Sequence, residues 1–278
     1  MNEKINSYLK RQMYNKTFNS CNYYILCDKE EYSGSIGKCN LLDSYKFRYF
    51  VNVLVINTLV SILINEKELR LDTKVKEILP DFMYDDVAII HLLTHSSGLV
   101  KKIDNKKYDT GSTVCFDDVN FKILRTIIEK LYTTDMELLA RSFIFEPLGM
   151  NDTRLVKNHI TTTITDLSHF TRMILNDGYY NRKFFIDIKY IDTWFKPLYI
   201  NDKDIRTTVG WVFGPSTDLC KNIDFSLNTV CFDENSYIII DRDNELIMIF
   251  LFDKVDNSKR NNINKYIFNE LKKIGKIY

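Results

Sequence analysis

The sequence has no excess of charge of either sign, and this excludes one class of partner at the outset. Its 278 residues carry 38 Lys and Arg against 37 Asp and Glu, which gives a formal net charge of +1. It also has no sustained basic block that could neutralise a run of phosphates. The sequence therefore predicts that nucleic acid is not a partner.

Paired cysteines and long apolar runs are missing as well. The most apolar stretches, VLVINTLVSILI and LIMIFLF, are too short or too interrupted to cross a bilayer. The chain opens with MNEKINSYLKRQM, in which no apolar export segment is present. We therefore expect a soluble, cytoplasmic protein with no membrane partner. No C-x-x-C pair occurs among the cysteines, which favours reduced structural thiols; they are Cys21, Cys27, Cys39, Cys115, Cys220 and Cys231.

The residues that are present are typical of a globular chain with a large core. Hydrophobic residues make up 45% of the sequence and aromatic residues 13%. Helical spacing of apolar residues predicts a helix over 3–13, and CNYYILCDKEEYSGSIGKCN is typical of a strand, a turn and a second strand. Mostly helical periodicity follows. Strands return after about residue 205, and 257–274 predicts a closing amphipathic helix.

This order of elements predicts the architecture. Strands at both ends of the chain enclose a helical middle, so we expect α/β plus all-α: one mainly antiparallel sheet built from both termini, flanked by helices, with an inserted helical domain. Residues near 20–50 and 205–252 should pair in that sheet. We predict one unit over 1–278, with 1–54 and 201–278 as the sheet subdomain and 55–200 as the helical subdomain.

Several long segments resemble one known family. LRLDTKVKEILPDF followed by AIIHLLTHSSGL, then IFEPLGMNDTRL and TDLSHFTRMILNDG, are similar to elements of the serine β-lactamase and penicillin-binding-protein superfamily. The likeness is strongest to class C β-lactamase-like esterases and D-alanyl-D-alanine carboxypeptidases, and SIGKCN stands where their second strand commonly reads G-Y-G-x-A-N. The resemblance spans most of the chain and implies a β-lactamase/transpeptidase-like fold. It also implies structural roles for His91 and His95.

The first catalytic element of that family is missing at the expected place. Acyl transfer of this kind needs a serine nucleophile and a lysine base one helical turn later, in the pattern Ser-x-x-Lys. Counting forward from FRYF puts the serine on Val51 and the lysine on Leu54. Counting back from the downstream loop moves the pair to Phe50 and Val53. Neither register contains a nucleophile or a base.

The second element, Tyr-x-Asn, is also changed. GSTVCFDDVNFKILRTIIE aligns without gaps to the family's G-x-x-F-x-Y-S-N-x-x-Y-x-x-L-G-x-I-I-E, which puts the tyrosine on Phe116 and the asparagine on Asp118. Loss of the phenol oxygen keeps the ring and removes its proton transfer.

The third element is a Lys-Thr-Gly or His-x-Gly strand, which holds the substrate carboxylate and supplies an oxyanion donor. It should fall near Val230, Cys231 and Phe232. The whole span 222–253 contains no lysine, histidine or glycine, so no shift of register restores it.

Other sites that the sequence suggests are weaker. Ser7 to Lys10 and Ser35 to Lys38 also spell Ser-x-x-Lys, but the first pair lies in the first helix and the second on a strand. Two histidines four residues apart, at 91 and 95, could bind a metal, but no third ligand is signalled nearby, and we predict neither a metal nor a cofactor. Cys115 lies in the second degenerate element, as Cys231 does in the third, without a predicted histidine partner.

These losses lead to two hypotheses. The first is a β-lactamase-like pseudoenzyme without catalytic residues, acting as a binding or regulatory module whose former groove is lined by the substituted residues. Because such a groove would be apolar, its ligand would be a small apolar molecule or a protein partner. The alternative is an active esterase, amidase or acyltransferase that uses displaced residues such as the two cysteines named above.

Overall fold

Eight strands form the main sheet of this computed structural model, which describes residues 1–200, 205–214, 217–218, 220, 228–233 and 235–277. All neighbouring strands are antiparallel. Their order across the sheet is β10 (Tyr199–Ile200), β11 (Arg206–Thr207), β12 (Val212–Phe213), β13 (Asn228–Phe232), β14 (Ser236–Asp241), β15 (Leu246–Val255), β1 (Phe18–Cys27) and β2 (Glu30–Ile36). Strands from the two ends of the chain meet where β15 pairs with β1, as the order of elements predicts.

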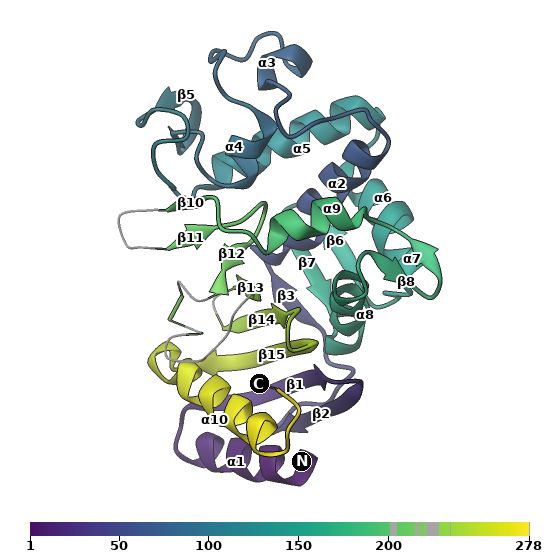
Figure 1. The fold of residues 1–278 in the computed structure, drawn as a ribbon, viewed down its shortest axis with the longest axis vertical. Helices are drawn as coiled ribbons and strands as arrows, with labels where there is room; N and C mark the ends of the chain where they lie inside the picture. The colour runs from purple at the N-terminus through teal and green to yellow at the C-terminus, as the bar shows by residue number, and fades with distance from the viewer. Residues whose placement is uncertain (201–204, 215–216, 219, 221–227, 234, 278) are drawn as a thin grey trace.

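The two terminal helices, α1 (Asn2–Tyr14) and α10 (Arg260–Lys273), cover one face of this sheet (Figure 1). The short turn η5 (Asn257–Lys259) precedes α10. Apolar residues on both helices form one buried cluster with alternate residues of β1, β14 and β15. The predicted helices over 3–13 and 257–274 are therefore confirmed, and they pack where the α/β part of the fold requires them.

The helical layer covers the other face. Its elements are η1 (Asn52–Asn57), α2 (Thr58–Asn65), α3 (Val75–Ile78), α4 (Ile89–Leu93), α5 (Asp118–Tyr132), α6 (Met136–Ala140), η2 (Arg141–Phe145), α7 (Glu146–Leu148), α8 (Ile164–Leu175), α9 (Ile188–Ile191) and η3 (Asp192–Trp194). A second buried cluster joins these helices to the remaining residues of β1, β14 and β15. The sheet is thus buried on both faces, and the period of two along each strand decides which cluster a residue joins.

Three small sheets complete the described part of the fold. They pair β3 (Tyr45–Phe47) with β7 (His159–Thr162) and β7 with β6 (Arg154–Val156), β4 (Leu99–Val100) with β5 (Lys102–Lys106), and β8 (Tyr179–Tyr180) with β9 (Lys183–Phe184). The first sheet corrects one prediction, because we expected residues near 20–50 to pair in the main sheet throughout. β3 instead pairs with β7, more than a hundred residues later.

The proposed subdomain boundaries fall next to continuous elements. The helix that begins at Phe50 continues through η1 and α2, and so crosses position 54. β10 starts at Tyr199, before position 201. The division at 54 and 200 remains a prediction. Among the described residues, no helix combines the length and apolar character needed to cross a membrane.

The backbone at Val209 and Gly210, between β11 and β12, packs closely against the Asn57 side chain of the helix that begins at Phe50. The Asn57 amide donates to the carbonyl of Val209 (3.3 Å) and accepts from the hydroxyl of Tyr190 (3.2 Å). The next residue, Gly210, has φ +75°, and its N–H donates to the carbonyl of Leu93 (3.2 Å). A Cβ on Gly210 would lie 2.4 Å from the amide carbon of Asn57. Only glycine fits this contact without displacing the hydrogen-bonded Asn57 side chain.

We therefore expect Gly210→Ala to lower the free energy of unfolding by about 2 to 4 kcal/mol, from left-handed strain plus overpacking. Gly275→Ala is the matched control, because Gly275 has φ +71° and nothing lies within 4 Å of its added Cβ. It should lose roughly 1 to 2 kcal/mol, from strain alone. Chemical denaturation of both variants measures the difference, and equal losses would show that the Asn57 contact has no role.

Candidate functional site

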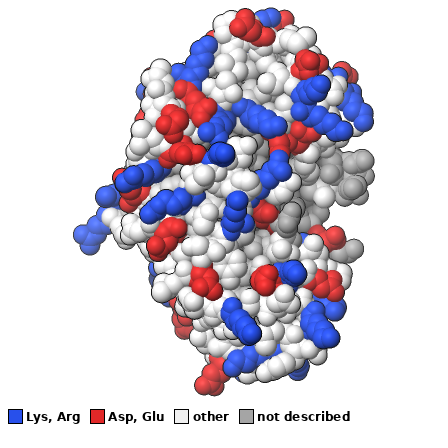
Figure 2. Space-filling view, turned by 180° about the vertical axis from the view of Figure 1, so that it is seen from behind, with Lys and Arg blue, Asp and Glu red and all other residues white. Residues whose placement is uncertain are grey.

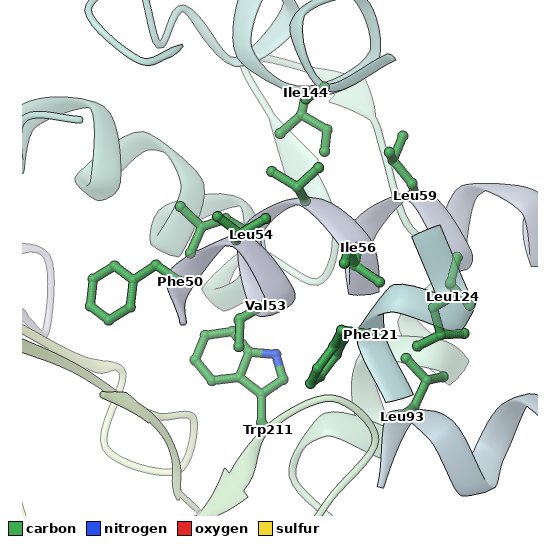
Figure 3. Packing of buried hydrophobic residues seen from close by; sticks show 14 of the residues in the cluster. Phe50, Val53, Leu54, Ile56, Leu59, Leu93, Phe121, Leu124, Ile144 and Trp211 are labelled. Carbon is green, nitrogen blue, oxygen red and sulfur yellow. The ribbon is translucent and has the colours of Figure 1, made fainter. Parts of the chain in front are cut away.

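The helix that should carry the nucleophile begins in the apolar core. Phe50 and Leu54 are fully buried, and Val51 and Val53 are each 6% exposed. The ring of Phe50 stacks on that of Phe47, with centroids 4.4 Å apart. Figure 3 shows Val53 facing the indole of Trp211. Both pairs of positions at which the sequence predicts the family's serine and lysine are therefore filled by packed hydrocarbon.

The carboxylate of Asp233 accepts hydrogen bonds from the backbone at the N-terminal end of this helix, which we call the helix entrance. Oδ2 of Asp233, directly after β13, accepts hydrogen bonds from the backbone N–H groups of Arg48 (2.9 Å) and Tyr49 (2.8 Å). Asp233 is 9% exposed. The negative charge lies at the N-terminal end of the helix, where the helix dipole favours it. This contact ties the end of β13 to the helix entrance.

An ion pair joins the start of this helix to α5. The guanidinium of Arg48 pairs with the carboxylate of Asp118, in the first turn of α5. Their side chains are 54% and 33% exposed, so the pair contributes at most about 1 kcal/mol to stability. The pair mainly affects geometry, because it bridges the start of the helix at Arg48 and the first turn of α5 at Asp118, the residue that aligns with the family's asparagine.

Phe116, which the sequence aligns with the family's tyrosine, lies against a histidine. Phe116 is 46% exposed, and its ring centroid lies 4.9 Å from that of His95. His95 also packs against Phe121 at 4.8 Å. Burial lowers the pKa of His95 to about 4, although the charge of Asp117 acts in the opposite direction. The imidazole is therefore neutral at pH 7.

Hydrogen bonds give both predicted histidines structural contacts. The Nδ1 atom of His95 accepts from the backbone N–H of Asp117 and lies 3.4 Å from the amide nitrogen of Asn120. Asn120 in turn accepts from the hydroxyl of Ser97 (2.5 Å), which is fully buried. The Nδ1 atom of His91 accepts from the backbone N–H of Ala88 (3.0 Å) at the start of α4. These contacts hold the turn after α4 and engage Nδ1 of each ring.

The predicted lining of the former groove is wrong for two of its residues. Leu54 is fully buried within the helical layer and lines no opening. Val230 is fully buried on the opposite face of the sheet, in the cluster of α1 and α10, because the register of β13 turns it that way. Cys231 and Phe232 are on β13, but their side chains lie outside the described part of the structure.

A small crevice remains beside the helix entrance. Its volume is about 60 Å³, and Val51, Ile56, Phe121 and Met136 provide its apolar surface. Its polar lining is made by Arg48, Asn52, Asp118, Lys122, Arg125 and Asn158. This lining is partly apolar and partly cationic, and the apolar groove expected from the sequence remains a prediction. The sequence prediction missed Asp233, because no local pattern indicates a contact between residues 185 positions apart.

The weaker sequence candidates are not brought together into a site. Ser7 and Lys10 are exposed on α1, while Ser35 is on β2 and Lys38 follows the strand. Cys115 is half-buried and not disulfide-bonded. Across the described ranges, no group of three or more His, Cys, Asp or Glu side chains gathers as a metal site.

Comparisons with known proteins show which folds this chain is similar to. The family model described as Beta-lactamase matches residues 54–159. No curated protein matches the chain. Among solved structures, a penicillin-binding protein homologue from Pyrococcus abyssi superposes with a TM-score of 0.81 at 14% identity, covering 99% of this chain and 78% of that one.

Two further structures are similar over nearly their whole length. A putative β-lactamase from Bacteroides dorei has a TM-score of 0.78 at 14% identity, covering 99% of this chain and 98% of its own. The D-alanine carboxypeptidase AmpC from Burkholderia cenocepacia has a TM-score of 0.77 at 14% identity, covering 97% and 98%. The predicted β-lactamase/transpeptidase-like fold is confirmed. The chain therefore shares the fold of these β-lactamases and penicillin-binding-protein homologues, and its residues 54–159 are similar to the Beta-lactamase family model.

Proposed function

We propose that this protein is a non-catalytic member of the superfamily that acts as a binding or regulatory module. The observation that carries the proposal is the packing of Phe50, Val51, Val53 and Leu54, which puts buried hydrocarbon at both possible positions of the nucleophile and the base. Removing a coupled nucleophile or base costs a serine hydrolase about a millionfold in rate. With Phe116 at the tyrosine position as well, family-type acyl transfer has no proton pathway.

The crevice supports a protein partner over a small-molecule ligand. Pockets for drug-sized ligands measure about 300–1,000 Å³, whereas this crevice has about 60 Å³. It has room for one apolar side chain of a partner, with the cationic groups at 48, 122 and 125 beside it. Figure 2 shows basic and acidic side chains interspersed over the face turned away from the viewer in Figure 1, which does not favour a polyanion such as nucleic acid.

The rival function is acyl transfer by a displaced residue, and Cys115 is its strongest candidate. It is a half-buried thiol, its backbone N–H donates to the carbonyl of His95 (2.8 Å), and it precedes Phe116. The neutral imidazole of His95 would be the base. Its Nδ1 atom is already engaged by the backbone of Asp117, which counts against this role.

The direct test is covalent labelling followed by intact-mass measurement. We expect no hydrolysis of a chromogenic cephalosporin, and no mass gain after incubation with penicillin or with a broad serine- and thiol-reactive acyl probe. One stoichiometric acyl adduct would contradict the proposal. The variant Cys115→Ser identifies the rival, since loss of such an adduct in this variant would assign the chemistry to that thiol.

A second prediction concerns restoration of the missing pair. Val51→Ser with Leu54→Lys, or Phe50→Ser with Val53→Lys, should give no ester hydrolysis, because Phe116 still cannot transfer a proton. Each double variant should also lose roughly 1 to 3 kcal/mol for every unsatisfied polar group placed in the core.

The matched control is Leu54→Met, which conserves volume and should cost less than about 1.5 kcal/mol. Thermal melts and an ester-hydrolysis assay compare all three proteins. A restored variant that is as stable as the control and turns over substrate would show that the catalytic geometry is intact.

A further inference from the structure

A second and larger cavity lies at the opposite end of the main sheet from the crevice. Its volume is about 510 Å³, within the range of small-molecule sites. Three segments form its walls: the β1–β2 turn, the C-terminal end of α8 and the β14–β15 turn. Cys27 and Leu246 are register partners, so the two turns are neighbours. The six residues of β14 separate this end of the sheet from Asp233, about 20 Å at 3.3 Å per residue.

One wall is fixed by an arginine from the helical layer. The Nε atom of Arg172, on α8, donates to the hydroxyl of Tyr24 (2.9 Å), and its guanidinium forms an ion pair with Glu31 on β2. The guanidinium carbon lies 5.6 Å from the centroid of the Tyr24 ring. These contacts hold the Arg172 side chain in one rotamer, and the carboxylate of Glu31 largely neutralises its charge.

The opposite wall is fixed by an arginine from the sheet. Arg242, in the β14–β15 turn, donates from Nη1 to Asp192 (2.6 Å) and from Nη2 to Asp177 (2.5 Å). Its guanidinium carbon lies 5.3 Å from the centroid of the Phe195 ring. Arg172 thus reaches from the helical layer to the sheet, and Arg242 reaches from the sheet to the helical layer. The cavity between them has walls that are ordered before any ligand binds.

Two further charges face the cavity and belong to neither arginine cluster. Lys29 is exposed in the β1–β2 turn, and Glu245 is exposed in the β14–β15 turn. Both have positive φ, 65° and 45°, so neither backbone is in an ordinary extended or helical state. They have opposite charges and line one cavity, yet neither forms an ion pair with the other or with another described residue.

We propose that this cavity binds a small zwitterion, with its carboxylate at Lys29 and its ammonium group at Glu245. The lining has three cationic and three anionic side chains, so it favours a ligand without net charge. A free anion would have to displace carboxylates that already satisfy Arg172 and Arg242. The proposal does not depend on the proposed function, because it concerns the other end of the sheet.

Calorimetric titration with glycylglycine and two charge-deleted analogues tests the proposal on the full chain. Glycylglycine should bind at one site. Glycylglycine amide, which lacks the carboxylate, and N-acetylglycylglycine, which lacks the ammonium group, should each bind at least about tenfold more weakly, as expected for loss of one charged hydrogen bond. No binding of glycylglycine at about 20 mM, or equal binding of all three, would overturn the proposal.

Single substitutions assign the two ends of the ligand. Lys29→Gln should make glycylglycine and its amide bind alike, whereas Glu245→Gln should make glycylglycine and its N-acetyl derivative bind alike. The control is Lys67→Gln, because Lys67 is also an exposed lysine with φ 65° but lies away from the cavity. All three variants should have the same thermal unfolding midpoint as the parent protein. Selectivity that is unchanged in Lys29→Gln and Glu245→Gln would contradict the assignment.

Discussion

Burial of the helix that begins at Phe50 is the constraint on which the rest of the structure depends. This helix is part of the helical layer, and its first turns contact β3, Trp211 and α5. A helix in this place must present apolar residues to several neighbours at once. Serine and lysine would each be costly there unless a complete polar network surrounded them. Aliphatic residues at 51, 53 and 54 remove that requirement, and under the proposed function they also leave the helix without a nucleophile and a base.

Several polar groups around this helix find partners within the chain, although Thr58 Oγ1 and Trp211 Nε1 are buried without a hydrogen bond among the described residues. Asp233 accepts from the backbone at the helix entrance, Arg48 pairs with Asp118, and Asn57 bonds to Val209 and Tyr190. An active site needs groups that remain available to a substrate. Here the described donors and acceptors stabilise the junction between the sheet and the helical layer instead. This is the arrangement that the proposed non-catalytic function requires of the centre.

Much of the fold could be predicted from the sequence because its signals are local. Alternation along β1 and β2, helical spacing in α1 and α10, and the segment from His91 to Gly98 each depend on neighbouring residues. The misses depend on distant ones. The pairing of β3 with β7 and the inward turn of Val230 are decided by tertiary register. The contact of Asp233 with the helix entrance and the cavity beside Arg172 join segments far apart in the chain, which no local pattern reveals.

Native-state hydrogen exchange tests the central claim most directly. If the helix that begins at Phe50 is part of the stable core, the amides of residues 53–57 should exchange only through global unfolding, with the same free energy as the amides of β1 and β15. The backbone amides of Arg48 and Tyr49 should be protected too, because they donate to Asp233. Exchange of these amides through a local opening of lower free energy than that of β1 would contradict the account, since it would show a mobile site rather than a packed one.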